Sequence, residues 1–124
     1  MENIYPEYVT KSAIEGLVKK IPVPDEYSQD WEYEVADSSR ITEFLYAYEK
    51  IELNKEERFT LMIIIISSFN DAIVEGKVEA NFSVIRYHLL QDINIHKNTI
   101  YYWSMLDEDD LENCYAVTSF IRGL

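Results

Sequence analysis

Hydrophobic residues recur through most of the chain at steps of three and four positions, which is the spacing of an amphipathic helix. The first such run covers residues 5–20 and ends at residues 21–24, where two prolines disfavour helical geometry in the residues before them. A second run follows Ser38 and Ser39, either of which can cap a helix N-terminus. Its apolar stripe consists of Ile41, Phe44, Leu45, Tyr48 and Ile51. The pattern therefore predicts two helices separated by residues 25–37, which lack this spacing.

The most apolar part of the chain lies between Asn54 and Gly76. Asn54, with Glu57 three positions later, has the arrangement of a capping box, and Gly76 stands where a C-terminal capping glycine is expected. Apolar side chains, including the isoleucines at residues 63–66, cover nearly all faces of a helix over residues 55–75. Consecutive isoleucines also suit a buried strand, but the length of the periodic run and the two caps favour a helix. A helix that is apolar all round belongs at the centre of a bundle.

The C-terminal part of the chain shows shorter helical runs. One spans residues 82–93 with Asn81 as its cap, another spans residues 99–106, and a last one begins at Thr118. The break between the first two is expected at one of the intervening asparagines. The positions expected to face inward are Phe82, Ile85, Leu89, Leu90, Ile93, Phe120 and Ile121.

Length and composition favour the same architecture. The 124 residues match the commonest size of a single domain, and Gly and Pro total only six, too few for a turn-rich β fold. Apolar and acidic residues alternate at residues 31–35, which is compatible with a short strand inside an otherwise extended loop. We predict an all-α fold with a single domain over residues 1–124. It is a bundle of five or six helices with a long acidic-aromatic loop after the first helix.

The charge is concentrated in two short segments. The chain has 23 acidic and 11 basic residues and a net charge of −12, of which residues 25–37 carry six acids and residues 107–112 carry five, with no base in either. Acidity of this kind often serves solubility alone. Two concentrated patches, however, create a directed field that attracts a basic protein partner. The same charge disfavours binding to nucleic acid or to an anionic membrane.

Few residues favour catalysis or metal binding. The single Cys114 excludes an internal disulfide and a Cys-based zinc site. His88, Asp92 and His96 would share one face of an unbroken helix, a spacing that suits a metal ion, but Asn94 is a potential break and a fourth ligand is lacking. We therefore predict no metal, no cofactor and no enzyme activity. An enzyme would instead require a pocket with converging polar groups, for example around a histidine or Tyr101.

Localisation is expected to be cytoplasmic. The first 15 residues lack the basic and apolar regions of a signal peptide, and the longest apolar run, residues 61–66, is too short to cross a bilayer. A single cysteine fits a reducing compartment.

Aromatic residues are interleaved with the first acidic segment. They serve either as anchors for a partner or as pins that hold the loop to the bundle, and the sequence favours neither. The predicted partner-binding residues combine both acidic segments with these rings. They are Asp25, Glu26, Asp30, Trp31, Glu32, Tyr33, Glu34, Asp107, Glu108, Asp109 and Asp110.

Four short segments carry a resemblance to a known class of proteins: Trp-Glu-Tyr-Glu at residues 31–34, Arg-Phe-Thr-Leu-Met at 58–62, Ser-Ser-Phe-Asn-Asp at 67–71, and Tyr-Tyr-Trp-Ser at 101–104 before an acidic turn. In a small acidic helical domain, they resemble immunity proteins of bacterial polymorphic-toxin and contact-dependent inhibition systems. The resemblance implies a protein that binds and neutralises a basic toxin domain, often a nuclease. The alternative is an acidic cytosolic interaction or regulatory module without a toxin partner, and a toxin gene directly upstream would favour the first.

Overall fold

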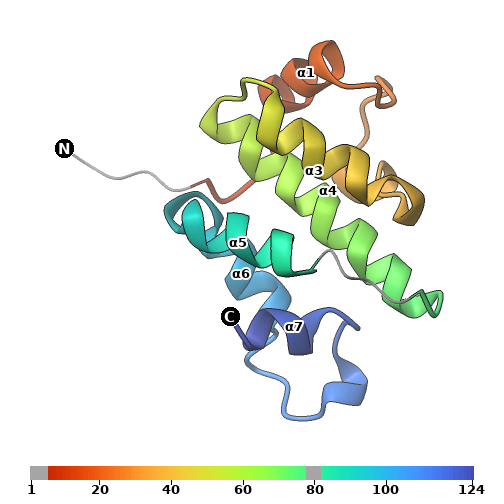
Figure 1. Ribbon diagram of the computed structural model, residues 1–124, viewed down its shortest axis with the longest axis vertical. Helices are drawn as coiled ribbons and strands as arrows, with labels where there is room; N and C mark the ends of the chain where they lie inside the picture. The colour runs from red at the N-terminus through yellow and green to blue at the C-terminus, as the bar shows by residue number, and fades with distance from the viewer. Residues whose placement is uncertain (1–5, 78–81) are drawn as a thin grey trace.

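The computed structural model describes residues 6–77 and 82–124, and Figure 1 shows the arrangement of their helices. They form α1 (Lys11–Lys20), α2 (Trp31–Glu34), α3 (Ile41–Lys50), α4 (Lys55–Val74), α5 (Phe82–Gln91), α6 (Ile93–Ser104) and α7 (Thr118–Arg122), with 3₁₀ turns η1 (Ser38–Arg40) and η2 (Leu111–Asn113). No strand occurs within these two ranges, so the all-α prediction is confirmed. The helices outnumber the predicted five or six because α2 forms in the segment that was expected to be extended.

Helix α4 is the centre of the bundle. It contacts α1, α2, α3, α5 and α6, and residues 59–69 are buried without interruption. Both hydrogen bonds of the predicted capping box are present at its start, between Asn54 and Glu57. At its end Gly76 has a φ of 79°, and the N–H of Lys77 donates to the carbonyl of Ala72, as in a Schellman cap. The predicted central helix and both of its caps are therefore confirmed.

The close approach of α1 to α4 depends on Gly16. A Cβ atom at this position would collide with the carboxylate of Glu57, which is buried and receives a hydrogen bond of 2.7 Å from Nζ of Lys20. A larger residue at this position would therefore displace the Glu57 carboxylate from its contact with Lys20. Helix α1 begins later than the predicted residue 5, because the hydroxyl oxygen of Thr10 accepts a hydrogen bond from the N–H of Ala13.

The break between α5 and α6 lies at Asp92, so the predicted break at residues 94–98 is wrong. Two predicted core residues beside the break face outward, since Leu90 is 39% and Ile93 is 40% exposed. The predicted cap Asn81 lies outside the described residues. At the C-terminus, Ile121 is buried as predicted, while Phe120 is partly exposed and packs edge-on against the core ring of Phe69 at 5.3 Å.

A buried polar network joins α3 to this break. The hydroxyl of Tyr48 donates to Oδ2 of Asp92 at 2.5 Å and accepts from Nε2 of His96 at 2.8 Å, which requires the Nε2–H form of a neutral His96. Burial lowers the pKa of His96 to about 4. His88 lies beside Tyr48 but interacts with Glu49, through a 2.7 Å contact. Nδ1 of His96 is buried without a hydrogen-bond partner. The described ranges contain no cluster of three His, Cys, Asp or Glu residues suited to a metal ion.

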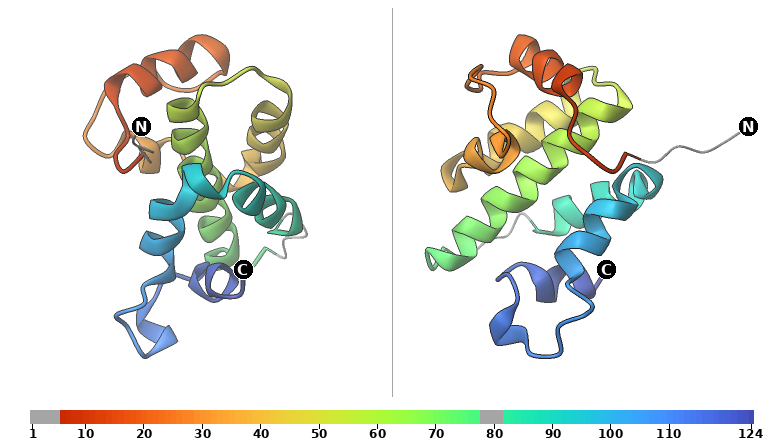
Figure 2. Two further views of the ribbon diagram at one scale, coloured as in Figure 1. Left: turned by 90° about the vertical axis from the view of Figure 1, so that its left-hand side faces the viewer. Right: turned by 180° about the vertical axis from the view of Figure 1, so that it is seen from behind.

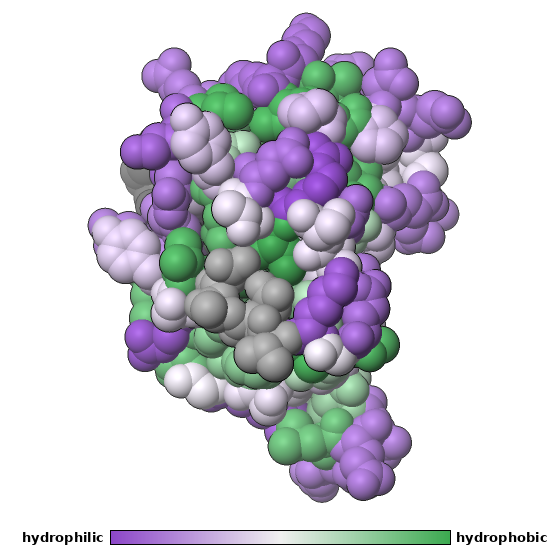
Figure 3. Space-filling view, turned by 45° about the vertical axis from the view of Figure 1, so that its right-hand side comes forward, coloured by the Kyte–Doolittle hydropathy of each residue, from purple (hydrophilic) through white to green (hydrophobic). Residues whose placement is uncertain are grey.

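Different helices lie on the two sides of the central helix α4. Figure 2 shows α2, α6 and the loop between α6 and α7 on one side of α4, while α3 and α5 lie on the other. Hydrophilic side chains cover much of the face in Figure 3, with apolar surface between them. None of the helices within the described ranges is both long and apolar enough to span a membrane.

Candidate functional site

The first acidic segment is fixed to the bundle by Trp31. Trp31 begins α2 and Val35 caps its end, so the two lie one turn apart and point into the core, while Tyr33 and Glu34 are exposed. Trp31 is only 1% exposed, and its Nε1–H donates to the carbonyl of Pro24 at 2.9 Å. The prediction that Trp31 contacts a partner is therefore wrong, as is the short strand: a helix turns the Trp ring inward, where it pins the loop.

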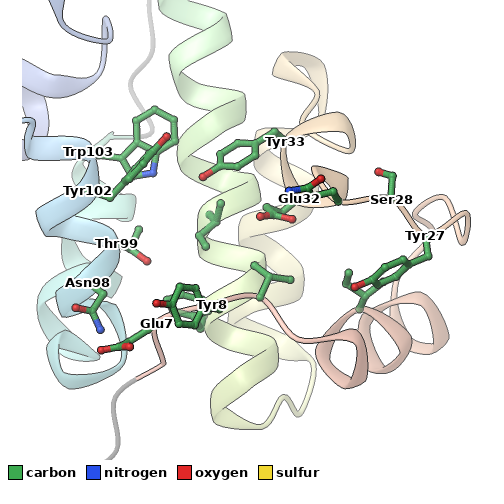
Figure 4. A pocket seen from close by; sticks show the side chains of 15 residues that line it. Glu7, Tyr8, Tyr27, Ser28, Glu32, Tyr33, Asn98, Thr99, Tyr102 and Trp103 are labelled. Carbon is green, nitrogen blue, oxygen red and sulfur yellow. The ribbon is translucent and has the colours of Figure 1, made fainter.

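An inner cleft of about 420 Å³ lies between the N-terminal segment, α2 and α6. This volume falls within the ordinary range of ligand sites. Figure 4 shows Glu32 and Tyr33 pointing from α2 towards α6, with Thr99, Tyr102 and Trp103 opposite. The complete lining is Glu7, Tyr8, Val9, Ile14, Tyr27, Ser28, Gln29, Glu32, Tyr33, Phe59, Ile63, Asn98, Thr99, Tyr102 and Trp103.

A second, more open hollow of about 610 Å³ continues from the inner cleft. The two share Glu7, Tyr8, Asn98 and Tyr102, so together they form one groove. The rest of the outer hollow is lined by Tyr101, Met105, Leu106, Asp107 and Glu108. We call the combined surface the tyrosine groove. The two acidic segments, 76 residues apart in the sequence at Glu32 and Glu108, thus border a single concave surface.

Aromatic contacts connect the first acidic segment, through Trp103, to Tyr115 just beyond the second. The ring centroid of Tyr33 lies 6.4 Å from that of Trp103, which in turn lies 4.7 Å from that of Tyr115, just after the second segment. The hydroxyls of Tyr102 and Tyr115 are 3.1 Å apart. Along the groove Tyr8 is 77% exposed, and Tyr27, Tyr101 and Tyr102 are also exposed. Large rings left at the surface of a concave region are typical of interaction sites.

The groove is electrostatically negative. Its lining includes Glu7, Glu32, Asp107 and Glu108, and none of the residues that line the two hollows is Lys or Arg. Burial raises the pKa of the Glu32 carboxyl, and the adjacent charge of Asp30 acts in the same direction. Ion pairs are found on other carboxylates, namely Glu43, Glu49, Glu57, Glu75 and Asp92. The acids of the groove therefore carry a field directed at an external cation.

The second acidic segment is held by Arg122. Its Nε donates to the carbonyl of Ser104 at 2.7 Å, and its Nη2 donates to those of Met105 at 2.6 Å and Glu108 at 2.8 Å. The guanidinium thus binds backbone oxygens and leaves the side chain of Glu108 at the groove. Oδ1 of Asp110 accepts from the N–H of Glu112 and caps η2, which is a structural role.

One polar atom at the groove lacks a partner. Thr99 is 3% exposed, and its Oγ1 has no hydrogen bond, although Figure 4 shows the hydroxyl directed towards the cleft. A buried hydroxyl without a partner costs about 1–3 kcal/mol. Thr99 lines the inner cleft, so a ligand there would provide the missing partner.

The groove contains some of the predicted contact residues but not all. Glu32, Tyr33, Asp107 and Glu108 line it, whereas Asp25 lines a separate shallow hollow. The remaining predicted acids line neither part of the groove: Glu26, Asp30, Glu34, Asp109 and Asp110.

Sequence reasoning missed the residues that α6 and the N-terminal segment contribute. They are Glu7, Tyr8, Asn98, Thr99, Tyr102 and Trp103. The run at residues 101–103 was the available signal, because three successive aromatic residues on a helix cannot all face the core. Neither His88 nor His96 lines the groove, while Tyr101 lines its outer part.

No protein-family model and no curated protein matches the chain, and its fold has no significant match among solved structures.

Proposed function

We propose that this protein binds a basic protein domain in the tyrosine groove and thereby neutralises it, the partner being a toxin domain such as a nuclease. One observation carries the proposal: two acidic segments distant in sequence border a single concave, tyrosine-rich surface. Acidity that served solubility alone would have no reason to converge on exposed aromatic rings. The choice of a toxin domain as the partner is based on the resemblance to immunity proteins.

The mechanism follows from the chemistry of nucleases. An enzyme that holds phosphates needs a positively charged cleft, and carboxylates can occupy that cleft in place of the phosphates. Charge steering raises association rates by about 10- to 10³-fold. The tyrosine rings add contact area at low conformational cost, since each has only two rotatable side-chain bonds.

Preorganisation supports the same proposal. Trp31 fixes the first acidic segment and Arg122 fixes the second, so the backbone near the groove is ordered before a partner arrives. A surface that needs no ordering on binding retains more of its interaction energy as affinity.

The test is co-expression with the product of the neighbouring upstream gene. We expect growth to be rescued and the two proteins to purify together. With the charge reversals Asp30→Lys and Glu32→Lys, association should slow and lose much of its salt dependence. Co-purification without any effect on growth would favour the interaction module instead, and unchanged association kinetics in the variant would refute this surface.

A further inference from the structure

We infer that the inner cleft receives an arginine side chain of the basic partner, held between Glu32 and the aromatic wall of α6. The inference rests on the proposed function, because it names the group of the partner that enters the groove. It is carried by two features of the cleft: a lining that combines buried apolar side chains with the carboxylate of Glu32 and aromatic rings, and the unpaired hydroxyl of Thr99.

The lining of the cleft changes character with depth. Its apolar part consists of Ile14, Phe59 and Ile63 from α1 and α4, all three of which are buried residues. The rings of Tyr33 and the buried Trp103 lie next to each other on one wall of the cleft, with their centroids 6.4 Å apart (Figure 4). An arginine side chain has matching parts, since its methylene stem is apolar and its guanidinium stacks on aromatic faces.

Hydrogen-bond acceptors are available where the guanidinium would lie. Glu32 is partly desolvated, which raises its pKa and makes a charged partner favourable. Oγ1 of Thr99 has no partner in the protein, and a donor from the ligand would satisfy it. Glu7, at the junction with the outer hollow, adds a second carboxylate. A cleft lined by several acceptors suits a guanidinium, which has five donors.

Arginine fits these features better than lysine does. A lysine ammonium is a strongly hydrated point charge with three donors, whereas the guanidinium is planar, more weakly hydrated and suited to aromatic walls. A metal ion is disfavoured because the described residues hold no group of three ligating side chains. The outer hollow is broader and lined by exposed tyrosines, so it would form the rim around this anchor.

The test is a titration of the purified protein with the peptide acetyl-Gly-Arg-Gly-amide, followed by calorimetry and by amide chemical shifts. We expect saturable binding with shifts centred on Thr99, Tyr102 and the indole N–H of Trp103. The lysine peptide should bind about three- to tenfold more weakly. The citrulline peptide, which is neutral and nearly the same shape, should not bind measurably.

Three substitutions test the cleft, and the first two separate its effect from that of net charge. Glu32→Gln should weaken arginine-peptide binding by about tenfold. Glu52→Gln removes the same charge from an exposed position that lines neither hollow and should leave binding unchanged. Thr99→Val should weaken binding while leaving the midpoint of unfolding unchanged or higher, because it removes a hydroxyl that has no partner.

Equal binding of the arginine and citrulline peptides would overturn the inference, as would shifts confined to surfaces outside the cleft or equal effects of Glu32→Gln and Glu52→Gln. The peptide titration and the co-expression test can fail independently of each other. If the arginine peptide fails to bind but the upstream protein co-purifies in a manner sensitive to Glu32→Lys, the proposed function stands and the arginine anchor is wrong. If the arginine peptide binds but no protein co-purifies, the cleft is correct and the proposed toxin partner is not.

Discussion

The two acidic segments of this protein are held in place by different means. Residues 25–37 are fixed by side-chain burial, since Trp31 and Val35 enter the core and the Trp31 indole donates to the backbone. Residues 107–112 have no buried anchor of this kind, and Arg122 instead binds the carbonyls of the preceding turn. Both segments are therefore held in place mainly by side chains other than their carboxylates.

Glu57 differs from the acids of these two segments. Glu57 is buried, caps α4 and pairs with Lys20, so its charge is used within the fold. Among the acids that line the groove, Glu108 accepts a long hydrogen bond of 3.3 Å from the N–H of Asp110, a contact that brings no opposite charge to the carboxylate. An acidic residue can therefore be assigned to folding if its carboxylate contacts groups of the fold. It can be assigned to recognition if other groups hold its backbone and its carboxylate faces the groove.

Removing the buried anchor should give the largest effect. Trp31→Ala leaves a cavity beneath α2 and is expected to lower the free energy of unfolding by about 3–5 kcal/mol. Trp31→Phe keeps most of the apolar contact but loses the hydrogen bond to Pro24, and should cost about 1–2 kcal/mol. Urea denaturation measures both. If Trp31→Ala is as stable as the native protein, the first segment is not held by burial.

Mild acid should act on the core through His96. Its pKa is about 4 in the folded protein against 6.5 for the free side chain, so the unfolded state binds more protons between these values. Stability should therefore fall by about 3 kcal/mol as the pH drops from 6.5 to 4. Glu32 acts in the opposite sense, because its pKa is raised.

Urea denaturation at several pH values tests this behaviour of the core. The variant His96→Gln removes the titrating group, so the slope of stability against pH should flatten between pH 6.5 and 4. Parallel slopes for the variant and the native protein would show that His96 does not set the response to acid.

Removing Arg122 should give a smaller and more local effect. Arg122→Ala deletes three hydrogen bonds to backbone oxygens at a partly exposed site and is expected to cost about 1–2 kcal/mol. Hydrogen exchange should accelerate at residues 105–113 and remain unchanged at residues 31–35. Equal acceleration in both segments would mean that they are not independently anchored.

Reversing charge on the second segment should affect stability least. Asp107→Lys with Asp109→Lys alters exposed side chains and should change the free energy of unfolding by less than about 0.5 kcal/mol. Thermal and urea unfolding would check this. A large loss of stability would assign these carboxylates to the fold rather than to recognition.

Periodicity predicted the central helix because a local signal determines it: residues 55–75 carry the apolar pattern, the capping box and the terminal glycine together. The inward turn of Trp31 could not be predicted from alternation, because the choice between strand and helix at residues 31–35 depends on packing against α4. The break at Asp92 likewise depends on a tertiary contact, its hydrogen bond with Tyr48.

The groove was predicted only in part for the same reason. Charge clustering identified Glu32 and Asp107 directly from the sequence, but nothing local indicates that Tyr8 and Tyr102 lie beside them. Their proximity arises because the chain before α1 crosses to α6, where the side-chain amide of Asn98 donates to the carbonyl of Pro6. Such a contact between distant parts of the chain has no signature in one sequence.

The most direct test compares the binding of an octa-arginine peptide to three variants that carry the same net charge. Two of them reverse acids that line the groove, from the first and from the second part of its lining: Glu7→Lys with Glu32→Lys, and Asp107→Lys with Glu108→Lys. The control, Glu52→Lys with Glu56→Lys, changes positions that line neither hollow. If the acidic segments form one docking surface, both groove variants will bind much more weakly than the control at physiological salt. Equal weakening in all three would show that only net charge matters and would contradict the account.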